Sequence, residues 1–332
     1  MKSIVITEHG APEVLQVQER IDPRPGSGEV AIDVAAAGVN FADVMARVGL
    51  YPDAPKPPVV VGYEVAGIVS ELGEGAQRFE VGDRVMAGTR FGGYSERVRA
   101  KVDDVVRLPE QMSFEEGAAV PVNYLTAYLG LMRFGALRAG ERVLIHAAAG
   151  GVGIAATQIA KHHGAEVLGT ASPQKHDAIR AIGVDHALDY TKPGWDKGLP
   201  KVDLVMDAVG GKSFRRSYGL LRPGGRLVCF GASAVMSGEK RNLVAAACAA
   251  VTMPRFNLIK QMSQSKSVIG LNMLTLWDEM GSLAPYLHAV EELIADGTIK
   301  PVVAKAFTFA QAPEAHRYLS ERRNVGKVVL TP

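Results

Sequence analysis

The sequence predicts an α/β protein with two domains, one resembling a β-barrel and the other built on a doubly wound parallel sheet. The chain has 332 residues, a length that suits about two domains. Short apolar segments separated by many glycines fill its first third, whereas apolar strands alternate with helices from about residue 141. The first pattern is typical of a compact β fold, and the second is typical of parallel strands joined by helices.

The first third is expected to be rich in β-strands. Residues 30–34 and the longer apolar run 59–69 are expected strands. Residues 82–86 are expected to form a turn that leads into another strand. Residues 113–130 are expected to form one helix, because Ser113 and Glu116 have the spacing of a capping box.

The second part follows a strand–helix rhythm, and a different pattern returns after residue 285. The expected strands are 142–146, 166–169, 186–188, 202–206, 226–230 and 267–271, and the expected helices are 154–163, 174–182 and 213–221. The last segment is expected to hold helices at 287–296 and 316–322 and a strand at 327–330.

Composition excludes several classes of protein. The net charge is only +2 with both signs interspersed, which argues against a nucleic-acid-binding face. Cys229 and Cys248 are the two cysteines, and their wide spacing argues against a disulfide framework and a cysteine-built zinc site. The N-terminus lacks the pattern of a signal peptide, and the apolar stretch 243–253 is too short to span a bilayer, so we expect a cytoplasmic protein.

A glycine-rich turn between an expected strand and an expected helix indicates a dinucleotide site. Its sequence reads Ala148-x-Gly150-x-x-Gly153, a variant of GxGxxG. The middle position lets the backbone approach a pyrophosphate, and the last lets the helix pack against the strand. The first N–H groups of the helix, at Gly151, Val152 and Gly153, then face the anion. The alternative is a tight strand–helix turn that binds no ligand.

The end of the second expected strand favours NADPH over NADH. NAD sites place an acidic residue there to bind the ribose hydroxyls, but residues 169–175 contain none. Ser172 and Lys175 instead offer a hydroxyl and an ammonium group, which bind a 2′-phosphate that a carboxylate would repel. The alternative is that Ser172 only caps the next helix and that Lys175 is solvated.

Several motifs, in matching order along nearly the whole chain, resemble one family. They are AGVNFAD at 37–43, PVVVGYEVAG at 58–67, GDRV at 82–85, LRAGERVLI at 137–145 and AGGVG at 149–153. These residues resemble the quinone oxidoreductase group of the medium-chain dehydrogenases/reductases. Segments 122–128, 169–172, 238–243 and 324–328 most resemble its vesicle amine transport protein branch. The resemblance implies a GroES-like catalytic domain from residues 1–121 and 286–332 and a Rossmann domain from residues 122–285.

The resemblance also predicts the absence of a metal. Zinc-dependent relatives carry Cys where Asn40 lies and His where Tyr63 lies, and Asn and Tyr are poor zinc ligands. Without a Lewis acid, hydrogen bonds must polarise a substrate carbonyl. The resemblance therefore implies hydride transfer from NADPH to a small hydrophobic quinone or α,β-unsaturated carbonyl.

The polar groups expected near the acceptor are Asn40, Tyr51, Tyr63 and Thr126, whereas Met45 replaces a tyrosine of some bacterial relatives. Residues expected to contact the cofactor share positions around the glycine-rich turn, the following strand ends and the tail. They are Asn40, Asn123, Thr126, Gly150, Gly151, Val152, Gly153, Ser172, Lys175, Tyr190, Phe230, Gly231, Asn324 and Lys327.

Alternative functions stay open. A nucleotide-binding protein without catalysis, which engages membranes or protein partners, is one, and accessory reduction in lipid or polyketide metabolism is another. The apolar segment 242–262 can cover a substrate, contact a second copy or meet a membrane surface. Family members dimerise through Rossmann edge strands, so residues 267–271 are the expected homodimer contact.

Overall fold

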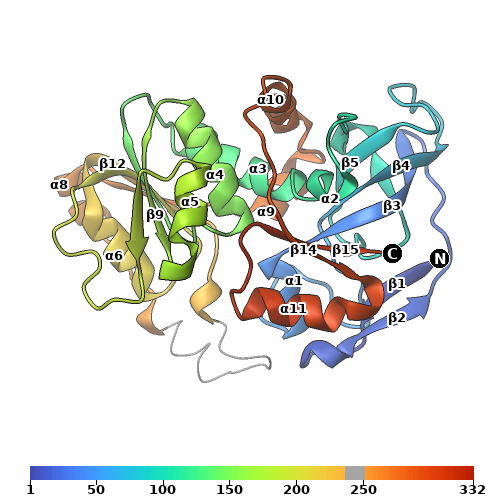
Figure 1. Ribbon diagram of the computed structural model, residues 1–332, viewed down its shortest axis with the longest axis horizontal. Coiled ribbons are helices and arrows are strands. Elements are labelled where there is room, and N and C mark those ends of the chain that lie inside the picture. Colours follow the sequence, from blue (N-terminus) through green and yellow to red (C-terminus); the bar gives the residue numbers. More distant parts are fainter. Residues whose placement is uncertain (236–250) are drawn as a thin grey trace.

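The computed structural model describes residues 1–235 and 251–332, which form two lobes side by side, each built on its own sheet (Figure 1). The mixed α/β class predicted from the sequence is confirmed. Residues 236–250, which include segment 238–243 and the start of the apolar segment 242–262, lie outside the described residues. In the described part, no helix has the length and apolar character needed to cross a membrane.

One lobe contains a six-stranded sheet in which every neighbouring pair is parallel. In spatial order its strands are β10 (His186–Asp189), β9 (Glu166–Ala171), β8 (Arg142–Ile145), β11 (Val202–Asp207), β12 (Leu221–Cys229) and β13 (Ser267–Gly270). The order reverses between β8 and β11, and such a switch point leaves a crevice at the carboxyl ends of the strands where ligands bind.

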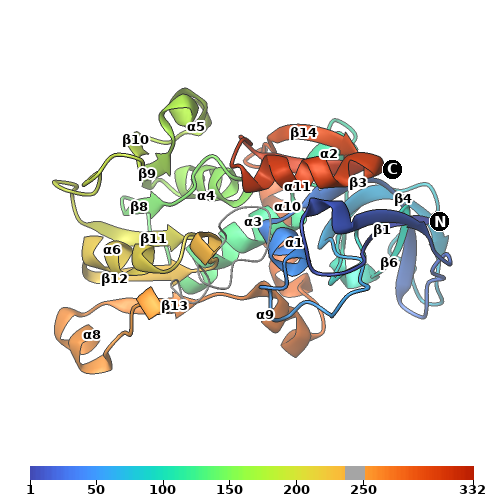
Figure 2. The same cartoon turned by 90° about the horizontal axis from the view of Figure 1, so that it is seen from below.

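Helices α4 (Gly151–His162), α5 (His176–Ile182) and α6 (Lys212–Leu220) connect successive strands of this sheet. The buried face of α4 consists mainly of alanine and isoleucine, and these small side chains let the helix lie close to β8 and β9. Helix α3 (Pro121–Tyr128) lies between the lobes and packs along α4 (Figures 1 and 2).

The other lobe contains a mostly antiparallel sheet to which the end of the chain returns. Its strand order is β14 (Val303–Thr308), β15 (Lys327–Thr331), β3 (Glu29–Val39), β4 (Glu64–Leu72), β5 (Arg84–Gly88) and β7 (Val105–Arg107). Strand β6 (Arg97–Lys101) also pairs with β3, and β1 (Lys2–Ile6) pairs with β2 (Leu15–Glu19). The tail thus joins the sheet formed by the first third, while the exact domain boundaries stay a prediction.

Two expected elements differ from the structure. The apolar run 59–69 is not one strand: β4 begins only at Glu64, and Val59 makes an isolated bridge with Ile6. The expected helix 113–130 is divided into α2 (Phe114–Gly117) and α3 because Pro121, at the first position of α3, cannot donate to a preceding turn. The capping box of Ser113 and Glu116 is confirmed.

Several elements carry weak signals in the sequence. Helices α1 (Phe41–Arg47), α8 (Leu258–Gln264) and α9 (Met273–Met280) are short, and β6 and β7 have only 5 and 3 residues. Helix α10 (Ala284–Ala295) and helix α11 (Ala312–Ser320) begin earlier than expected because each starts with proline in its first turn.

After the parallel sheet the chain continues into helix α9, which attaches this segment to the other lobe. The Trp277 indole N–H donates to Asp104 Oδ2 at 3.2 Å, and Ser282 and the Leu283 N–H donate to Asp104 Oδ1. A Cβ added at Gly88 of β5 would lie 2.8 Å from the Trp277 ring, so the indole packs directly on this strand.

We expect Trp277→Ala to lower the free energy of unfolding by about 3–5 kcal/mol, because it leaves a cavity and removes a buried hydrogen bond. Trp277→Phe keeps an aromatic ring and should cost less. Urea unfolding followed by circular dichroism measures both, and a Trp277→Ala midpoint equal to that of the wild type would contradict the assigned packing.

Candidate active site

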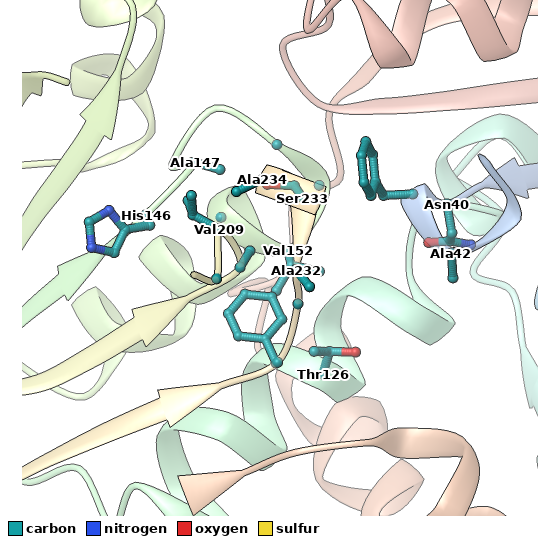
Figure 3. A pocket seen from close by; sticks show the side chains of 18 of the residues that line it. Asn40, Ala42, Thr126, His146, Ala147, Val152, Val209, Ala232, Ser233 and Ala234 are labelled. Atoms are coloured by element: carbon teal, nitrogen blue, oxygen red, sulfur yellow. The ribbon is translucent and has the colours of Figure 1, made fainter. Parts of the chain in front are cut away.

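A large cavity of about 1200 Å³ runs past the carboxyl ends of the parallel strands to the other lobe. Figure 3 shows its length, with His146 and Ala147 at one side, Asn40 and Ala42 at the opposite side and Thr126 between them. Its wall combines residues from both sheets, from α3 and from the tail, so the cavity depends on how these distant segments meet.

The glycine-rich turn forms one wall of the cavity. Gly150 precedes α4, and a Cβ added there would meet only the Ala147 carbonyl oxygen, at 3.3 Å. At Gly151 and Gly153 a Cβ would collide at 2.4 Å with Asn123 and with the Ala147 oxygen. Ala147, one position before the expected start of the motif, has the left-handed φ of 53°. The turn therefore leaves open space at Gly150 and exposes the first N–H groups of α4.

A polar corner lies at the end of β9. Ser172, Lys175, Tyr190 and Arg322 all line the cavity there. The Lys175 ammonium donates to the carbonyl oxygens of Arg322 and Asn324, each at 2.6 Å, so it also attaches the tail. Burial and, to a smaller extent, the charge of Arg322 lower the pKa of Lys175.

The loop after β11 forms the wall beside the glycine-rich turn. Asp207 accepts hydrogen bonds from the Val209 N–H at 2.8 Å and from Ser217 Oγ at 2.7 Å. His146, which follows β8, contacts Ser217 through Nε2 at 2.9 Å, and burial lowers its pKa. Residue Gly231, after β12, packs against the carbonyl of residue 208, which leaves no room for a side chain there.

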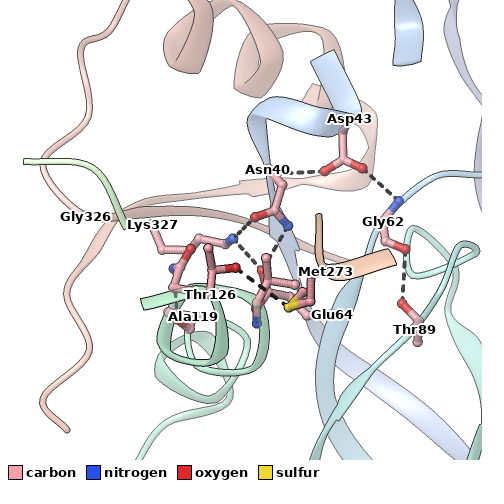
Figure 4. Close-up of polar contacts among 12 residues, drawn as sticks. Asn40, Asp43, Gly62, Glu64, Thr89, Ala119, Thr126, Met273, Gly326 and Lys327 are labelled. Atoms are coloured by element: carbon pink, nitrogen blue, oxygen red, sulfur yellow. Dashed lines mark hydrogen bonds and ion pairs between the residues drawn. The ribbon is translucent and has the colours of Figure 1, made fainter. Parts of the chain in front are cut away.

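At the other end of the cavity, Asn40 belongs to a closed set of polar contacts with Glu64 and Lys327 (Figure 4). Asn40 Nδ2 donates to Glu64 Oε1 at 2.9 Å, and Lys327 Nζ donates to Asn40 Oδ1 at 2.7 Å and to Glu64 Oε1. The Val122 N–H, at the start of α3, donates to Glu64 Oε2 at 2.7 Å. Glu64 therefore connects β4, α1, α3 and the tail.

A second buried carboxylate holds the backbone beside Asn40 and Tyr63. Asp43 accepts hydrogen bonds from the N–H groups of Asn40 (2.7 Å) and Gly62 (3.0 Å) and from Tyr94 Oη (3.0 Å). Burial is the main cause that raises the pKa of Asp43, to about 7, although these donors and Lys327 oppose it.

The remaining groups expected near an acceptor line the same end. Tyr51 packs edge-on to Tyr63, and burial raises the pKa of Tyr51 to about 12. The Tyr63 ring lines the cavity, but its hydroxyl is closed off from solvent and has no hydrogen-bond partner among the described residues. Thr126 Oγ1 makes a weak contact of 3.7 Å with Met273 Sδ. Burial also raises the pKa of Tyr63, so both phenols stay protonated near neutral pH.

Every residue expected to contact the cofactor or the acceptor lies on the wall of this cavity. Their individual roles stay predictions. Sequence reasoning missed Glu64, Asp43 and Arg322. Glu64 and Asp43 are acidic residues inside the apolar motifs 58–67 and 37–43, a signal that points to a buried carboxylate. Arg322 carried no comparable signal.

Comparisons with known proteins match the whole chain. The profile described as alcohol dehydrogenase GroES-like domain matches residues 26–110, and that described as zinc-binding dehydrogenase matches residues 182–330. A synaptic vesicle membrane protein VAT-1 homolog of Danio rerio is 38% identical over 99% of this chain and 70% of its own length. The chain belongs to the medium-chain dehydrogenase/reductase family.

Solved structures of this family show the same fold. An Escherichia coli quinone oxidoreductase complexed with NADPH has a TM-score of 0.85 and 32% identity, with 100% of both chains covered. The CurK enoyl reductase has a TM-score of 0.86 and 30% identity, with 99% of this chain and 98% of that chain covered. The chain is thus an oxidoreductase of the quinone oxidoreductase and enoyl reductase type.

The name of one matching profile mentions zinc, so we asked whether the side chains at the Asn40 end of the cavity could bind a metal ion. Across residues 1–235 and 251–332, no group of three or more His, Cys, Asp or Glu side chains is arranged to hold a metal ion. Asn40 is engaged by Glu64 and Lys327, and Tyr63 presents a ring to the cavity.

Asp43 should make the stability of the fold depend on pH. Its folded-state pKa of about 7 exceeds its ordinary 3.8, so its contribution is fully present below pH ~4 and is lost as pH rises through about 7. Asp43→Asn removes this dependence. We therefore expect the melting temperature of the wild type minus that of Asp43→Asn to fall from pH 5 to about pH 7 and to change little above pH 7. A difference that is constant across this range, or that grows with pH, would contradict the raised pKa.

Proposed function

We propose that this chain is an NADPH-dependent, zinc-independent reductase that transfers a hydride to a quinone or to an α,β-unsaturated carbonyl. The observation that carries the proposal is one continuous cavity that contains both the glycine-rich turn and the Asn40 end. A cofactor that binds along the turn can therefore reach an acceptor beside Asn40 and Thr126 without leaving the cavity.

The residues present fit a dinucleotide. The open space at Gly150 and the free N–H groups at the start of α4 suit a pyrophosphate. Asn123, Phe230, Gly231, Asn324 and Lys327 would line the path toward the reactive end. NADPH complexes among the structural relatives support the same assignment.

The polar corner after β9 favours the phosphorylated cofactor. Ser172, Lys175 and Arg322 offer a hydroxyl and two cations on the cavity wall, and no carboxylate lies among the cavity residues of this corner. Tyr190 adds an aromatic face. A 2′-phosphate would gain charge-assisted hydrogen bonds there, whereas the ribose of NADH lacks the acidic partner that it normally uses.

The acceptor end suits a planar, apolar molecule that carries a carbonyl oxygen. Met45, Tyr51, Tyr63, Met273 and Leu274 supply an apolar wall. Bound NADPH would supply the hydride. When an acceptor carbon receives it, negative charge develops on the conjugated carbonyl oxygen.

Asn40 and Thr126 are the groups best placed to stabilise that oxygen. Asn40 uses one of its two amide protons on Glu64, so the other is available for a ligand in the cavity. The Thr126 hydroxyl makes only its weak contact with sulfur and can turn toward the oxygen. A solvent proton completes the reduced product. Hydrogen bonds thus replace the metal that Asn40 and Tyr63 are poorly suited to bind.

A binding protein without turnover is the second candidate. A relative is named as a synaptic vesicle membrane protein, and α8 exposes apolar side chains: Leu258, Ile259 and Met262 are 73%, 76% and 77% exposed. Membrane contact, homodimer formation through β13 and a cytoplasmic location all stay predictions.

The test is NADPH oxidation by the purified chain with quinones and enones, with NADH in parallel. Turnover that prefers NADPH supports the proposal, and the preferred acceptor defines the substrate class. NADPH binding without turnover of any acceptor would favour the binding protein instead.

Lys175→Gln and Arg322→Gln should each raise the Kd of NADPH by about 10- to 100-fold and change that of NADH by less than about threefold, because each removes a charged hydrogen bond to the 2′-phosphate. Lys161→Gln is the matched control: Lys161 lies on α4, pairs with Asp185 and is not among the residues that line the cavity. Fluorescence titration measures all of these affinities. Equal losses for NADPH and NADH would sink the assignment of this corner.

A further inference from the structure

We propose that Glu64 is a positioning residue that neutralises Lys327 and fixes the Asn40 amide, and that it thereby sets the relative affinity for the oxidised and reduced cofactor. This inference rests on the proposed function. Glu64 lies behind the cavity wall and does not line it, so it must act through the residues that it holds.

Glu64 is built into the structure as a carboxylate with several donors. Its side chain is fully buried, and it receives hydrogen bonds from Asn40, Lys327 and the Val122 N–H. Space for it comes from Gly38 on β3: a Cβ there would lie 2.7 Å from Glu64 Cγ and 2.5 Å from the carbonyl oxygen of Ala118. Only glycine fits at this position of β3, because the Glu64 side chain occupies the space of a Cβ.

The contacts fix the orientation of Asn40. A carboxylate only accepts hydrogen bonds and an ammonium group only donates them. Asn40 Nδ2 must therefore face Glu64, and Oδ1 must face Lys327, as Figure 4 shows. Without Glu64, the amide could turn and present its oxygen to an acceptor carbonyl, which would repel it.

The same carboxylate cancels a buried positive charge on the wall. Lys327 lines the cavity, its side chain is 3% exposed, and Glu64 is its only ion-pair partner among the described residues. Asp43 also lies close enough to Lys327 for their charges to interact. With Glu64 ionised, the pair adds little net charge to the reactive end.

A change in this balance should be measurable without turnover. The nicotinamide ring is positively charged in NADP⁺ and neutral in NADPH. An uncompensated Lys327 ammonium would weaken NADP⁺ binding more than NADPH binding, and an uncompensated Glu64 would do the reverse. At the effective dielectric constant of a protein, a unit charge several ångströms away is enough for about a 10-fold change in the ratio of the two dissociation constants.

The test measures the Kd of NADP⁺ and of NADPH for the intact chain at pH 7 by calorimetry. We expect Glu64→Gln, which keeps the shape of the side chain, to raise the ratio of Kd(NADP⁺) to Kd(NADPH) by about 10-fold. Lys327→Met should lower the ratio, and the double variant should return it to within about threefold of wild type. Glu64→Asp, which keeps the charge, should leave the ratio close to wild type.

Glu71→Gln is the matched control, because Glu71 lies near the far end of β4 and pairs with Arg97 away from the cavity. It should leave the ratio unchanged. A ratio for Glu64→Gln within twofold of wild type, or a double variant no closer to wild type than the single one, would overturn the inference. If Glu64→Gln does not fold, the opposite shift in Lys327→Met still decides. A wild-type chain that binds neither cofactor form would instead overturn the proposed function itself.

Discussion

The buried contact between Glu64 and Lys327 holds together the parts of the chain that form the reactive end of the cavity. Glu64 begins β4, and Lys327 begins β15, near the end of the chain. Isolated buried charges are costly, so two of them in this position are tolerable only because each also has hydrogen-bond partners. Asn40 and the first turn of α3 provide these partners, which ties their positions to the same pair.

The tail extends this connection to the glycine-rich turn. Gly326 forms a parallel bridge with Gly150, and its N–H donates to the Ala149 carbonyl oxygen at 2.8 Å. A Cβ at Gly326 would lie 2.1 Å from the Val302 carbonyl oxygen, so only glycine fits where the tail passes between the two lobes. Together with Lys175, these contacts place the tail along one side of the cavity. The two ends of the cavity are therefore linked through the tail, which contacts both lobes.

The sequence predicts the cofactor end of this cavity better than the acceptor end, for a physical reason. The cofactor end is made by a strand, a tight turn and a helix that are adjacent in the chain. The role of Gly150 and Gly153 can therefore be predicted from the neighbouring residues alone. The acceptor end combines side chains separated by hundreds of residues. Asn40 and Tyr63 could be expected there only through the family resemblance, and the carboxylate that orients Asn40 is visible only once β4 and the tail meet. Likewise, the division of the expected helix 113–130 at Pro121 matters because it frees the Val122 N–H for Glu64.

The central claim is that one NADPH lies along this cavity with its reactive end beside Asn40. A crystal structure of the chain with NADPH tests it most directly. The account predicts the pyrophosphate over Gly150 and the start of α4, the 2′-phosphate beside Ser172, Lys175 and Arg322, and the nicotinamide near Asn40 and Thr126. A nicotinamide bound away from Asn40, or a phosphate that avoids the corner after β9, would contradict it.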